Sequence, residues 1–251
     1  SEINLLSQDT SSYGKDLRDG TELSGLLRAL ISVPGDYWIR MFYCYPNSFT
    51  DEVLEVMASD PRFCRYLDMP FQHISDPVLK KMNRKITRKE IEATMARVRR
   101  KLPDVAWRTT FIVGFPTETD QDFEELVDFV SEGHFQHLGI FLYSDEDNIR
   151  SSKFGDPIPL SLKEERKNRL MEIQQKISRE HHQKMVGSLQ QVLVGGFSSE
   201  TDLLLEGRNQ YQGPEVDGVV YINEGNATSA GFHQVEITEA HEYDLVGKIL
   251  N

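Results

Sequence analysis

Hydrophobic positions in the first two thirds of the chain fall into short runs that alternate with amphipathic segments. The clearest unit spans residues 107–125, where Gly114 and Pro116 break the β-branched run Thr109–Val113 and an acidic amphipathic segment follows. Such a run predicts a strand buried on both faces, and Thr119 is placed to cap the helix after it. This unit is therefore expected to be a strand, a tight turn and a helix.

The same alternation recurs on both sides of that unit. Four further apolar runs predict strands at Ile3–Leu6, Tyr37–Tyr43, Tyr66–Met69 and His137–Tyr143. Helical spacing and capping residues predict helices at Leu23–Ile31, from Thr50 to Met57, from Ser75 or Asp76, and from a Thr87/Glu90 capping box to Lys101. Five strands alternating with helices predict right-handed crossovers and a parallel sheet or partial barrel.

The first run, Ile3–Leu6, is expected to be a buried strand. A native domain rarely begins on a core strand, so we expect this chain to be part of a longer protein.

The pattern changes after the stiff segment Asp156–Pro159. Ser161 and Glu164 have the spacing of a second capping box, which predicts a long charged helix that ends near Val186 and leaves the sheet. Short apolar runs follow, with turns between them, at Leu189–Val194, Leu203–Glu206, Val219–Ile222, Val235–Ile237 and Leu245–Ile249. They predict a small all-β barrel. The expected domains are residues 1–160, a connecting helix at 161–187 and a separate antiparallel barrel at 188–251.

Parallel sheets bind ligands at the carboxyl ends of their strands. The residues expected there form a polar rim of Gln8, Asp9, Gln72, His73, Gly114, Tyr143 and Ser144. Gln72 and His73 suit hydrogen bonds to a ribose or a carboxylate, or equally a role in capping the next helix and tying loops together. Gly114 has no Cβ, so either a ligand approaches its backbone or the turn alone requires it.

Arg108 is the most informative charged residue of the central strand. Pointing inward, it would clamp a carboxylate; a structural ion pair with a neighbouring loop fits the sequence equally well. The pair His181 and His182 lacks metal-ligand spacing and is expected on a solvated helix surface, and His134 and His137 are expected in a loop without a chemical role. No Walker loop, dinucleotide fingerprint or Ser-His-Asp spacing is present.

Charge is unevenly distributed along the chain. The net charge is −12, and residues 188–251 contain ten acidic residues against Arg208 and Lys248. An acidic last quarter repels phosphate backbones and attracts a basic protein surface, although solubility alone also explains it.

No apolar run is long enough to cross a membrane. Two cysteines are present, and Cys44 lies in an apolar strand pattern, which favours a reduced, buried thiol and a cytoplasmic protein.

Motifs along the whole chain resemble those of the radical S-adenosylmethionine methylthiotransferases. They are Tyr13–Leu17, Trp38–Arg40, Tyr66–Asp68, Gln72–Ser75, Arg108–Pro116 and Pro214–Gly218. The closing segment Glu242–Gly247 is similar to the branch of that family that modifies ribosomal protein S12.

The resemblance implies an α/β fold, a partial TIM-like barrel followed by an OB-like TRAM barrel. It also implies S-adenosylmethionine, two 4Fe-4S clusters and transfer of a methylthio group to the β-carbon of an aspartate. The implied cofactor-binding positions are Gln72, His73, Ser75, Arg108, Thr110, Gly114 and Phe115. The expected substrate contacts are Gln8, Asp9 and Tyr143 of the polar rim and Glu215, Asp217, Glu242 and Asp244 of the acidic barrel.

One departure from the family pattern is large. The C-x-x-x-C-x-x-C loop that ligates the S-adenosylmethionine cluster has no counterpart, nor do three further cysteines of the family's N-terminal domain, and two scattered cysteines cannot hold a cluster. We therefore expect no metal ligands in this polypeptide, which should be inactive alone although its parent protein is an enzyme.

Two other functions also fit the sequence. The branch that methylthiolates adenosine in transfer RNA would require a basic TRAM domain, and the acidic last quarter opposes it. A non-catalytic acidic adaptor that binds a basic ribosomal protein is the second alternative.

Overall fold

A computed structural model of the chain describes residues 1–146, 151–225, 227 and 230–250. Its first part contains five parallel strands, β1 (Glu2–Leu5), β2 (Trp38–Met41), β3 (Tyr66–Asp68), β4 (Ala106–Val113) and β5 (His137–Leu142). β1 pairs with β2, and β3, β4 and β5 pair in that order. The amide of Cys64 donates to the Ile39 carbonyl at 2.9 Å, which joins the two sheets into one row. The predicted parallel α/β fold is confirmed.

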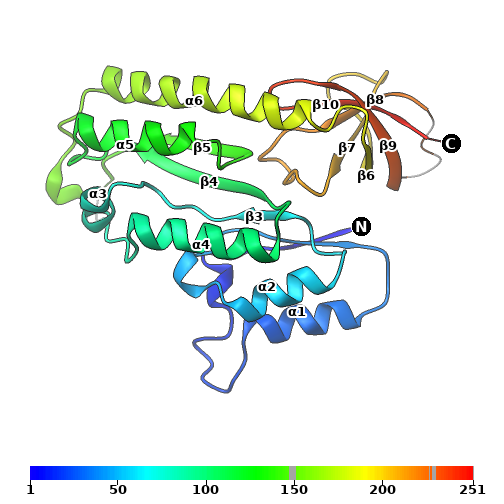
Figure 1. The fold of residues 1–251 in the computed structure, drawn as a ribbon, viewed down its shortest axis with the longest axis horizontal. Helices are drawn as coiled ribbons and strands as arrows, with labels where there is room; N and C mark the ends of the chain where they lie inside the picture. Colours follow the sequence, from blue (N-terminus) through cyan, green and yellow to red (C-terminus); the bar gives the residue numbers. More distant parts are fainter. Residues whose placement is uncertain (147–150, 226, 228–229, 251) are drawn as a thin grey trace.

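Within the described residues, six α-helices connect and cover these strands (Figure 1). They are α1 (Leu23–Ser32), α2 (Asp51–Ser59), α3 (Asp76–Lys81), α4 (Arg88–Lys101), α5 (Asp120–Ser131) and α6 (Leu160–Gln183). Three single 3-10 turns lie at Thr10–Ser12, Pro46–Ser48 and Ser152–Phe154. Large apolar side chains fill the space between helices and strands, among them Phe71, Trp107, Phe111 and Phe135, each at most 1% exposed.

Three predicted helix caps are present. The hydroxyl of Thr50 accepts the Val53 amide at the start of α2. Thr87 and Glu90 form a reciprocal capping box at α4, and Thr119 forms another at α5 with the carboxylate of Asp122. These bonds satisfy amides that a helix start would otherwise leave without partners, so the helix starts could be located from sequence.

The first strand differs from its predicted environment. β1 was expected to be buried, but Asn4 is exposed and the other three residues are half-buried. β1 pairs on one side only, with β2. Its row of backbone groups is therefore at the open edge of the partial barrel, which explains why its apolar residues are not enclosed.

The long helix α6 begins one residue earlier than predicted and without the predicted cap. Its N-cap is Pro159, no side chain caps it, and the expected Ser161–Glu164 box does not form. α6 also does not leave the sheet, because it packs against α5 and β5 (Figure 1). Gln174, 1% exposed, donates from Nε2 to the carbonyls of Phe135 and Gln136 at 3.0 and 3.2 Å.

The end of α6 corrects the expectation for its paired histidines. His182 is 4% exposed, and its Nδ1 lies 3.1 Å from the carbonyl of His241 in the following domain. A solvated surface was predicted for this residue, and the burial could not be seen from sequence because the covering segment lies about 60 residues later.

The last five strands form a closed barrel, ordered β10-β8-β7-β6-β9. They are β6 (Leu189–Phe197), β7 (Leu205–Asn209), β8 (Val220–Glu224), β9 (Gly231–Ala240) and β10 (Leu245–Ile249). The all-β barrel is confirmed, with one difference: β10 runs parallel to β8, so the barrel is not purely antiparallel. Val192, Val220, Val235, Ile237 and Leu245 fill its interior, each fully buried.

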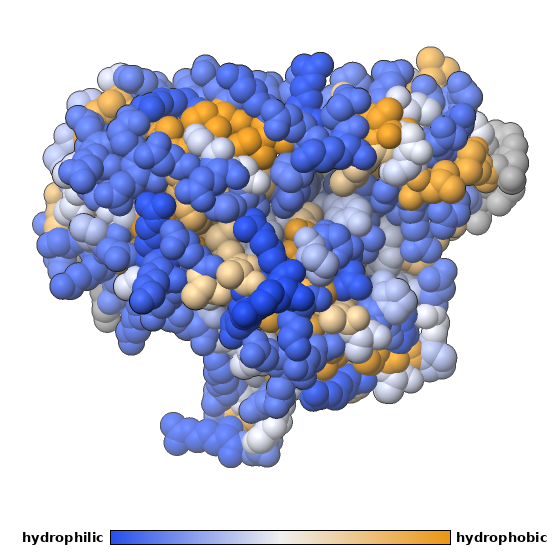
Figure 2. Space-filling view, viewed as in Figure 1, coloured by the Kyte–Doolittle hydropathy of each residue, from blue (hydrophilic) through white to orange (hydrophobic). Residues whose placement is uncertain are grey.

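Figure 2 shows a mostly hydrophilic face on which hydrophobic residues gather in small, separate patches. Within the residues that the structure describes, none of the helices combines the length and the hydrophobicity that crossing a bilayer requires.

Candidate functional site

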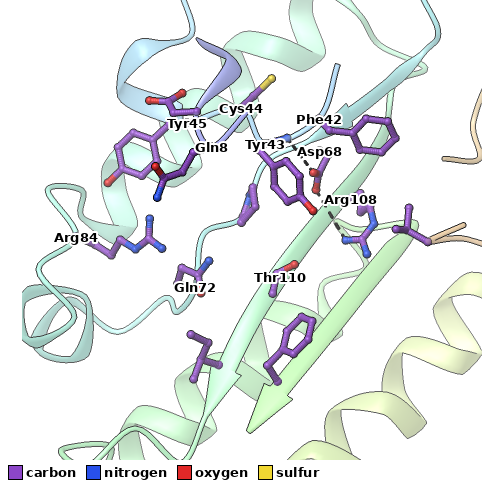
Figure 3. A pocket seen from close by; sticks show the side chains of 15 residues that line it. Gln8, Phe42, Tyr43, Cys44, Tyr45, Asp68, Gln72, Arg84, Arg108 and Thr110 are labelled. Atoms are coloured by element: carbon purple, nitrogen blue, oxygen red, sulfur yellow. Dashed lines mark hydrogen bonds and ion pairs between the residues drawn. The ribbon is translucent and has the colours of Figure 1, made fainter. Parts of the chain in front are cut away.

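The candidate site is a cavity of about 470 Å³ at the carboxyl ends of β1, β2 and β3 and along the faces of β4 and β5 (Figure 3). It is lined by Gln8, Asp9, Phe42, Tyr43, Cys44, Tyr45, Asp68, Pro70, Gln72, Arg84, Arg108, Thr110, Ile112, Phe141 and Val216. A volume of this size lies within the range of about 300–1,000 Å³ that small-molecule sites have.

The pleat of β4 decides which of its side chains reach the cavity. Arg108, Thr110 and Ile112 are half-buried and line it, whereas Thr109 and Phe111 are fully buried on the other face. Alternation with period two is the geometry of any strand. β4 was expected to be buried on both faces, and its half-buried face is instead the wall of the cavity.

The sequence-predicted residues are not all in one cavity. Gln8, Asp9, Gln72, Arg108 and Thr110 line the cavity. Gln72 adopts a left-handed backbone conformation, with φ of 74°. A second cavity of about 370 Å³ shares Gln72 with the first and is lined by further predicted residues, Phe115, Tyr143 and Ser144.

His73 and Ser75 lie outside both cavities. His73 is fully buried, and its Nδ1 accepts the Ser75 amide at 3.0 Å, which leaves the ring proton on Nε2. The hydroxyl of Ser75 donates to Asp122 at the start of α5. Burial lowers the pKa of His73 from 6.5 to about 4, against the opposing charge of Asp122. His73 thus fixes the loop after β3, and Ser75 connects that loop to α5.

Gly114 occupies the turn after β4, with φ of 74°. A Cβ at this position would overlap the aliphatic chain of Lys163 from α6. The nitrogen of Lys163 donates to the Tyr143 carbonyl at 2.9 Å and to the Asp156 carboxylate. The open side of the glycine is therefore occupied by a protein side chain rather than left free for a ligand.

A buried carboxylate fixes the same turn. Glu118 Oε2 accepts the amides of Gly114 and Phe115 at 2.8 and 3.2 Å, and Oε1 accepts from Arg166 of α6 at 2.8 Å. Burial raises the pKa of Glu118 to about 6, although Arg166 and the two amides oppose the rise. Helix α6 thus holds the carboxyl end of β4 through the aliphatic chain of Lys163 and the charge of Arg166.

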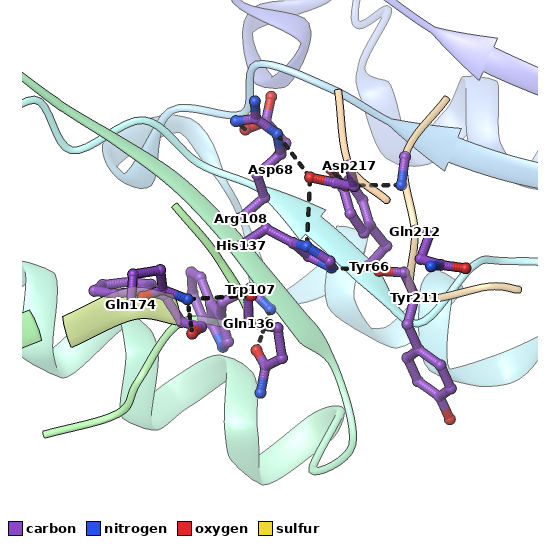
Figure 4. Close-up of polar contacts among 12 residues, drawn as sticks. Tyr66, Asp68, Trp107, Arg108, Gln136, His137, Gln174, Tyr211, Gln212 and Asp217 are labelled. Carbon is purple, nitrogen blue, oxygen red and sulfur yellow. Dashed lines mark hydrogen bonds and ion pairs between the residues drawn. The ribbon is translucent and has the colours of Figure 1, made fainter. Parts of the chain in front are cut away.

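Arg108 lies between two carboxylates (Figure 4). Its Nη1 is 3.8 Å from Asp68 Oδ1, and its Nε is 3.4 Å from Oδ1 of Asp217 in the barrel. Asp68 Oδ2 accepts the Tyr43 amide at 3.0 Å, and Oδ1 is buried without a hydrogen bond. Burial raises the pKa of Asp68, although the Tyr43 amide and Arg108 oppose the rise.

Asp217 was predicted to be a substrate contact on an acidic surface, but its side chain is 3% exposed. Oδ2 accepts the hydroxyl of Tyr66 at 2.7 Å and the amide of Gly213 at 2.8 Å. Oδ1 is also 3.4 Å from Nδ1 of His137, whose Nε2 lies 2.7 Å from the Tyr211 carbonyl. This carboxylate therefore lies inside the junction between the two domains.

The other predicted acidic contacts of the barrel differ in exposure and in partners. Glu215 is exposed, with φ of 64°. Glu242 forms an ion pair with Arg179 of α6 at 3.2 Å, and Asp244 accepts the Val219 amide at 2.8 Å. These carboxylates therefore bond to different partners within the chain.

Sequence reasoning missed several residues of the site. Arg84 lines both cavities, and Figure 3 shows it at the opposite end of the larger one from Arg108. Val216 of the barrel lines the larger cavity, and His137 contacts Asp217 although it was expected to have no role. A loop arginine and contacts between segments about 80 residues apart carry no local signal, so these positions could not be found from periodicity.

Both cysteines are free and buried, as predicted for Cys44. Burial raises the pKa of the Cys64 thiol to about 12 and that of Cys44 further. Within the described part of the chain, no group of three or more His, Cys, Asp or Glu side chains is arranged to hold a metal ion.

Two sequence profiles match the chain. The profile of the radical SAM superfamily matches residues 3–130, and the profile of the TRAM domain matches residues 186–250. Among solved structures, coproporphyrinogen III oxidase (HemN) from Escherichia coli, described as a radical SAM enzyme, superposes with a TM-score of 0.54 at 16% identity. The match covers 84% of this chain and 54% of that one, and it supports the fold alone.

Curated relatives match over nearly the whole chain. The ribosomal protein uS12 methylthiotransferase RimO of Geobacter sulfurreducens is 43% identical over 250 residues, which is 100% of this chain and 56% of the relative. The protein of the same name from Bdellovibrio bacteriovorus is 46% identical over 254 residues, covering 99% of this chain and 56% of the relative. The chain thus spans about half the length of these relatives.

Proposed function

This chain belongs to the radical SAM superfamily, and from that premise we propose that it forms part of a methylthiotransferase acting on ribosomal protein S12. The reaction would place a methylthio group on the β-carbon of an aspartate. The observation that carries this proposal is the 43–46% identity, over at least 99% of the chain, to relatives named for S12 methylthiolation.

Radical SAM chemistry depends on S-adenosylmethionine and a 4Fe-4S cluster. The larger cavity suits S-adenosylmethionine in size, and its wall combines apolar side chains with Gln72, Arg108 and Thr110, which would hold the polar groups. The buried Oδ1 of Asp68, which lacks a hydrogen-bond donor, offers a further acceptor. Bound there, S-adenosylmethionine would supply radical chemistry once a reduced 4Fe-4S cluster delivered one electron to it.

The residues of this chain do not fit a 4Fe-4S cluster. Such clusters need several thiolates at set spacing, and the chain has Cys44 and Cys64, both buried with raised pKa values. No step through a cluster is therefore derived from this polypeptide. We propose that both clusters of the family belong to parts of the protein other than this chain, and that the chain alone is inactive.

Charge supports a protein substrate over a nucleic acid. The barrel segment 188–251 contains ten acidic and two basic residues, and Glu200, Asp202, Glu215, Glu224 and Glu239 are exposed. A negative field raises the association rate of a basic partner and repels phosphates. This favours ribosomal protein S12 over transfer RNA.

Two reduced, buried thiols agree with a cytoplasmic location.

A binding titration separates these substrates. This chain is titrated with isolated ribosomal protein S12 and with transfer RNA, each at low and moderate salt. We expect binding to S12 that weakens as salt rises, because exposed charges are screened over roughly 8 Å at physiological ionic strength. Tighter binding to transfer RNA would overturn the substrate assignment. S12 binding by the chain, without methylthiolation by the complete protein, would favour the non-catalytic adaptor.

A further inference from the structure

The Asp217 carboxylate is the point at which the TRAM barrel meets the wall of the cavity (Figure 4). Each of its oxygens has two neighbours: Tyr66 and the Gly213 amide at Oδ2, and Arg108 and His137 at Oδ1. Three of these four groups, Tyr66, Arg108 and His137, lie on strands β3, β4 and β5 of the other domain. The carboxylate is thus held from several directions rather than by one flexible partner.

Close backbone packing supports this arrangement. A Cβ on Gly213 would lie 2.7 Å from the Tyr66 hydroxyl, and a Cβ on Gly218 would overlap the Tyr243 carbonyl. Glycine at both positions lets the loop that carries Asp217 lie against β3 on one side and the barrel on the other. The position of the carboxylate is consequently fixed by the backbone around it.

Arg108 has few other anchors. Its nearest approach to Asp68 is 3.8 Å, and its Nε makes no hydrogen bond of good geometry. An arginine side chain has many rotamers, so the charge of a second carboxylate, 3.4 Å from Nε, favours those that keep the guanidinium at the cavity wall. Val216, the residue before Asp217, itself lines the cavity.

We propose that Asp217 is a positioning residue that orients Arg108 at the cavity wall, so that the TRAM barrel shapes a binding site in the α/β domain. The barrel then contributes to ligand binding directly, in addition to any role in docking the substrate. The proposal rests on the proposed function only for the identity of what the cavity binds.

The first test needs no ligand. Arginine side-chain ¹H–¹⁵N spectra are recorded for this chain, and the Arg108 Nε–H resonance is assigned with Arg108→Lys. We expect Asp217→Asn to shift that resonance and to speed its exchange with water. Asp202→Asn, which removes the same charge from an exposed site of the same barrel, should leave it unchanged.

A second control separates docking from positioning. Tyr66→Phe removes one hydrogen bond across the domain junction but leaves the Asp217 carboxylate facing Arg108. The Arg108 resonance should stay close to its wild-type position in this variant. If Asp217→Asn does not fold, Asp217→Glu replaces it, because the longer side chain keeps the charge but moves the carboxylate and should shift the same resonance.

The second test uses the complete protein. Asp217→Asn and Arg108→Gln should each raise the KM for S-adenosylmethionine by about tenfold with a smaller change in kcat. The double variant should be no worse than Arg108→Gln alone, because Asp217 acts through Arg108. The proposal would be overturned if the Arg108 resonance were unchanged in Asp217→Asn. It would also be overturned if the increases in KM multiplied in the double variant. The spectra involve no substrate, so they remain decisive even if S12 proves not to be the substrate.

Discussion

Single side chains from helix α6 hold the loops around the site in place. Lys163 and Arg166 reach from α6 to the turn after β4, where they meet Gly114 and Glu118. A change at this turn therefore acts on the end of β4, the strand whose face lines the cavity. Such a change is expected mainly to lower the free energy of unfolding, because the contacts involved are buried.

Substituting Gly114 by alanine should destabilise the fold for two reasons. The left-handed φ costs an alanine about 1 kcal/mol, and overlap with Lys163 adds roughly 1–3 kcal/mol. Gly20 has a similar φ of 88° with open space around it, so Gly20→Ala should show the first cost alone. Urea unfolding of both variants measures the difference, and equal losses would show that Lys163 moves aside freely.

His73 should make the stability of the protein depend on pH. The folded state takes up a proton on His73 only near pH 4, whereas the unfolded chain does so near 6.5, because burial lowers the pKa in the folded state. The free energy of unfolding should therefore fall as pH drops from 6.5 to 4, on the order of 3 kcal/mol from this residue.

The comparison that isolates this effect is His73→Asn against His241→Asn, since the His241 side chain is 55% exposed. Urea unfolding across that pH range should show a shallower loss in His73→Asn and an unchanged loss in His241→Asn. Parallel curves for the wild type and His73→Asn would contradict a neutral, buried imidazole.

At the level of elements, local signals located most starts and ends. The Thr87 and Thr119 capping boxes form as predicted because their bonds lie within one helical turn. The Ser161–Glu164 pattern failed because the preceding prolines and the packing of Lys163 and Arg166 start α6 earlier. The exposure of β1 and the burial of His182 depend on what lies beside them in space, which hydrophobic spacing does not encode.

Two hydroxyl substitutions test this distinction. Thr87→Ala removes a working cap and should lower the free energy of unfolding by about 1 kcal/mol. Ser161→Ala removes an exposed hydroxyl inside α6, with an expected effect within about 0.5 kcal/mol. Thermal or urea unfolding checks both, and a larger loss for Ser161→Ala would mean that α6 starts where the sequence pattern placed it.

At the scale of the whole molecule, the two domains share the site. The sequence predicted both folds and five residues of the larger cavity, Gln8, Asp9, Gln72, Arg108 and Thr110. It could not predict the contribution of the barrel, since Asp217 looks like one more acidic surface residue until Tyr66, Arg108 and His137 are brought around it. The acidic field of the barrel and its buried carboxylate are therefore separate features with separate tests.

The most direct test is the reaction itself in the complete protein. The full reading frame that contains this chain is expressed without oxygen, reconstituted with iron and sulfide, and incubated with S-adenosylmethionine, a reductant and either ribosomal protein S12 or transfer RNA. Mass spectrometry should find one methylthio group on an aspartate of S12 and none on transfer RNA. A methylthio group on adenosine, with S12 unmodified, would contradict the proposed function.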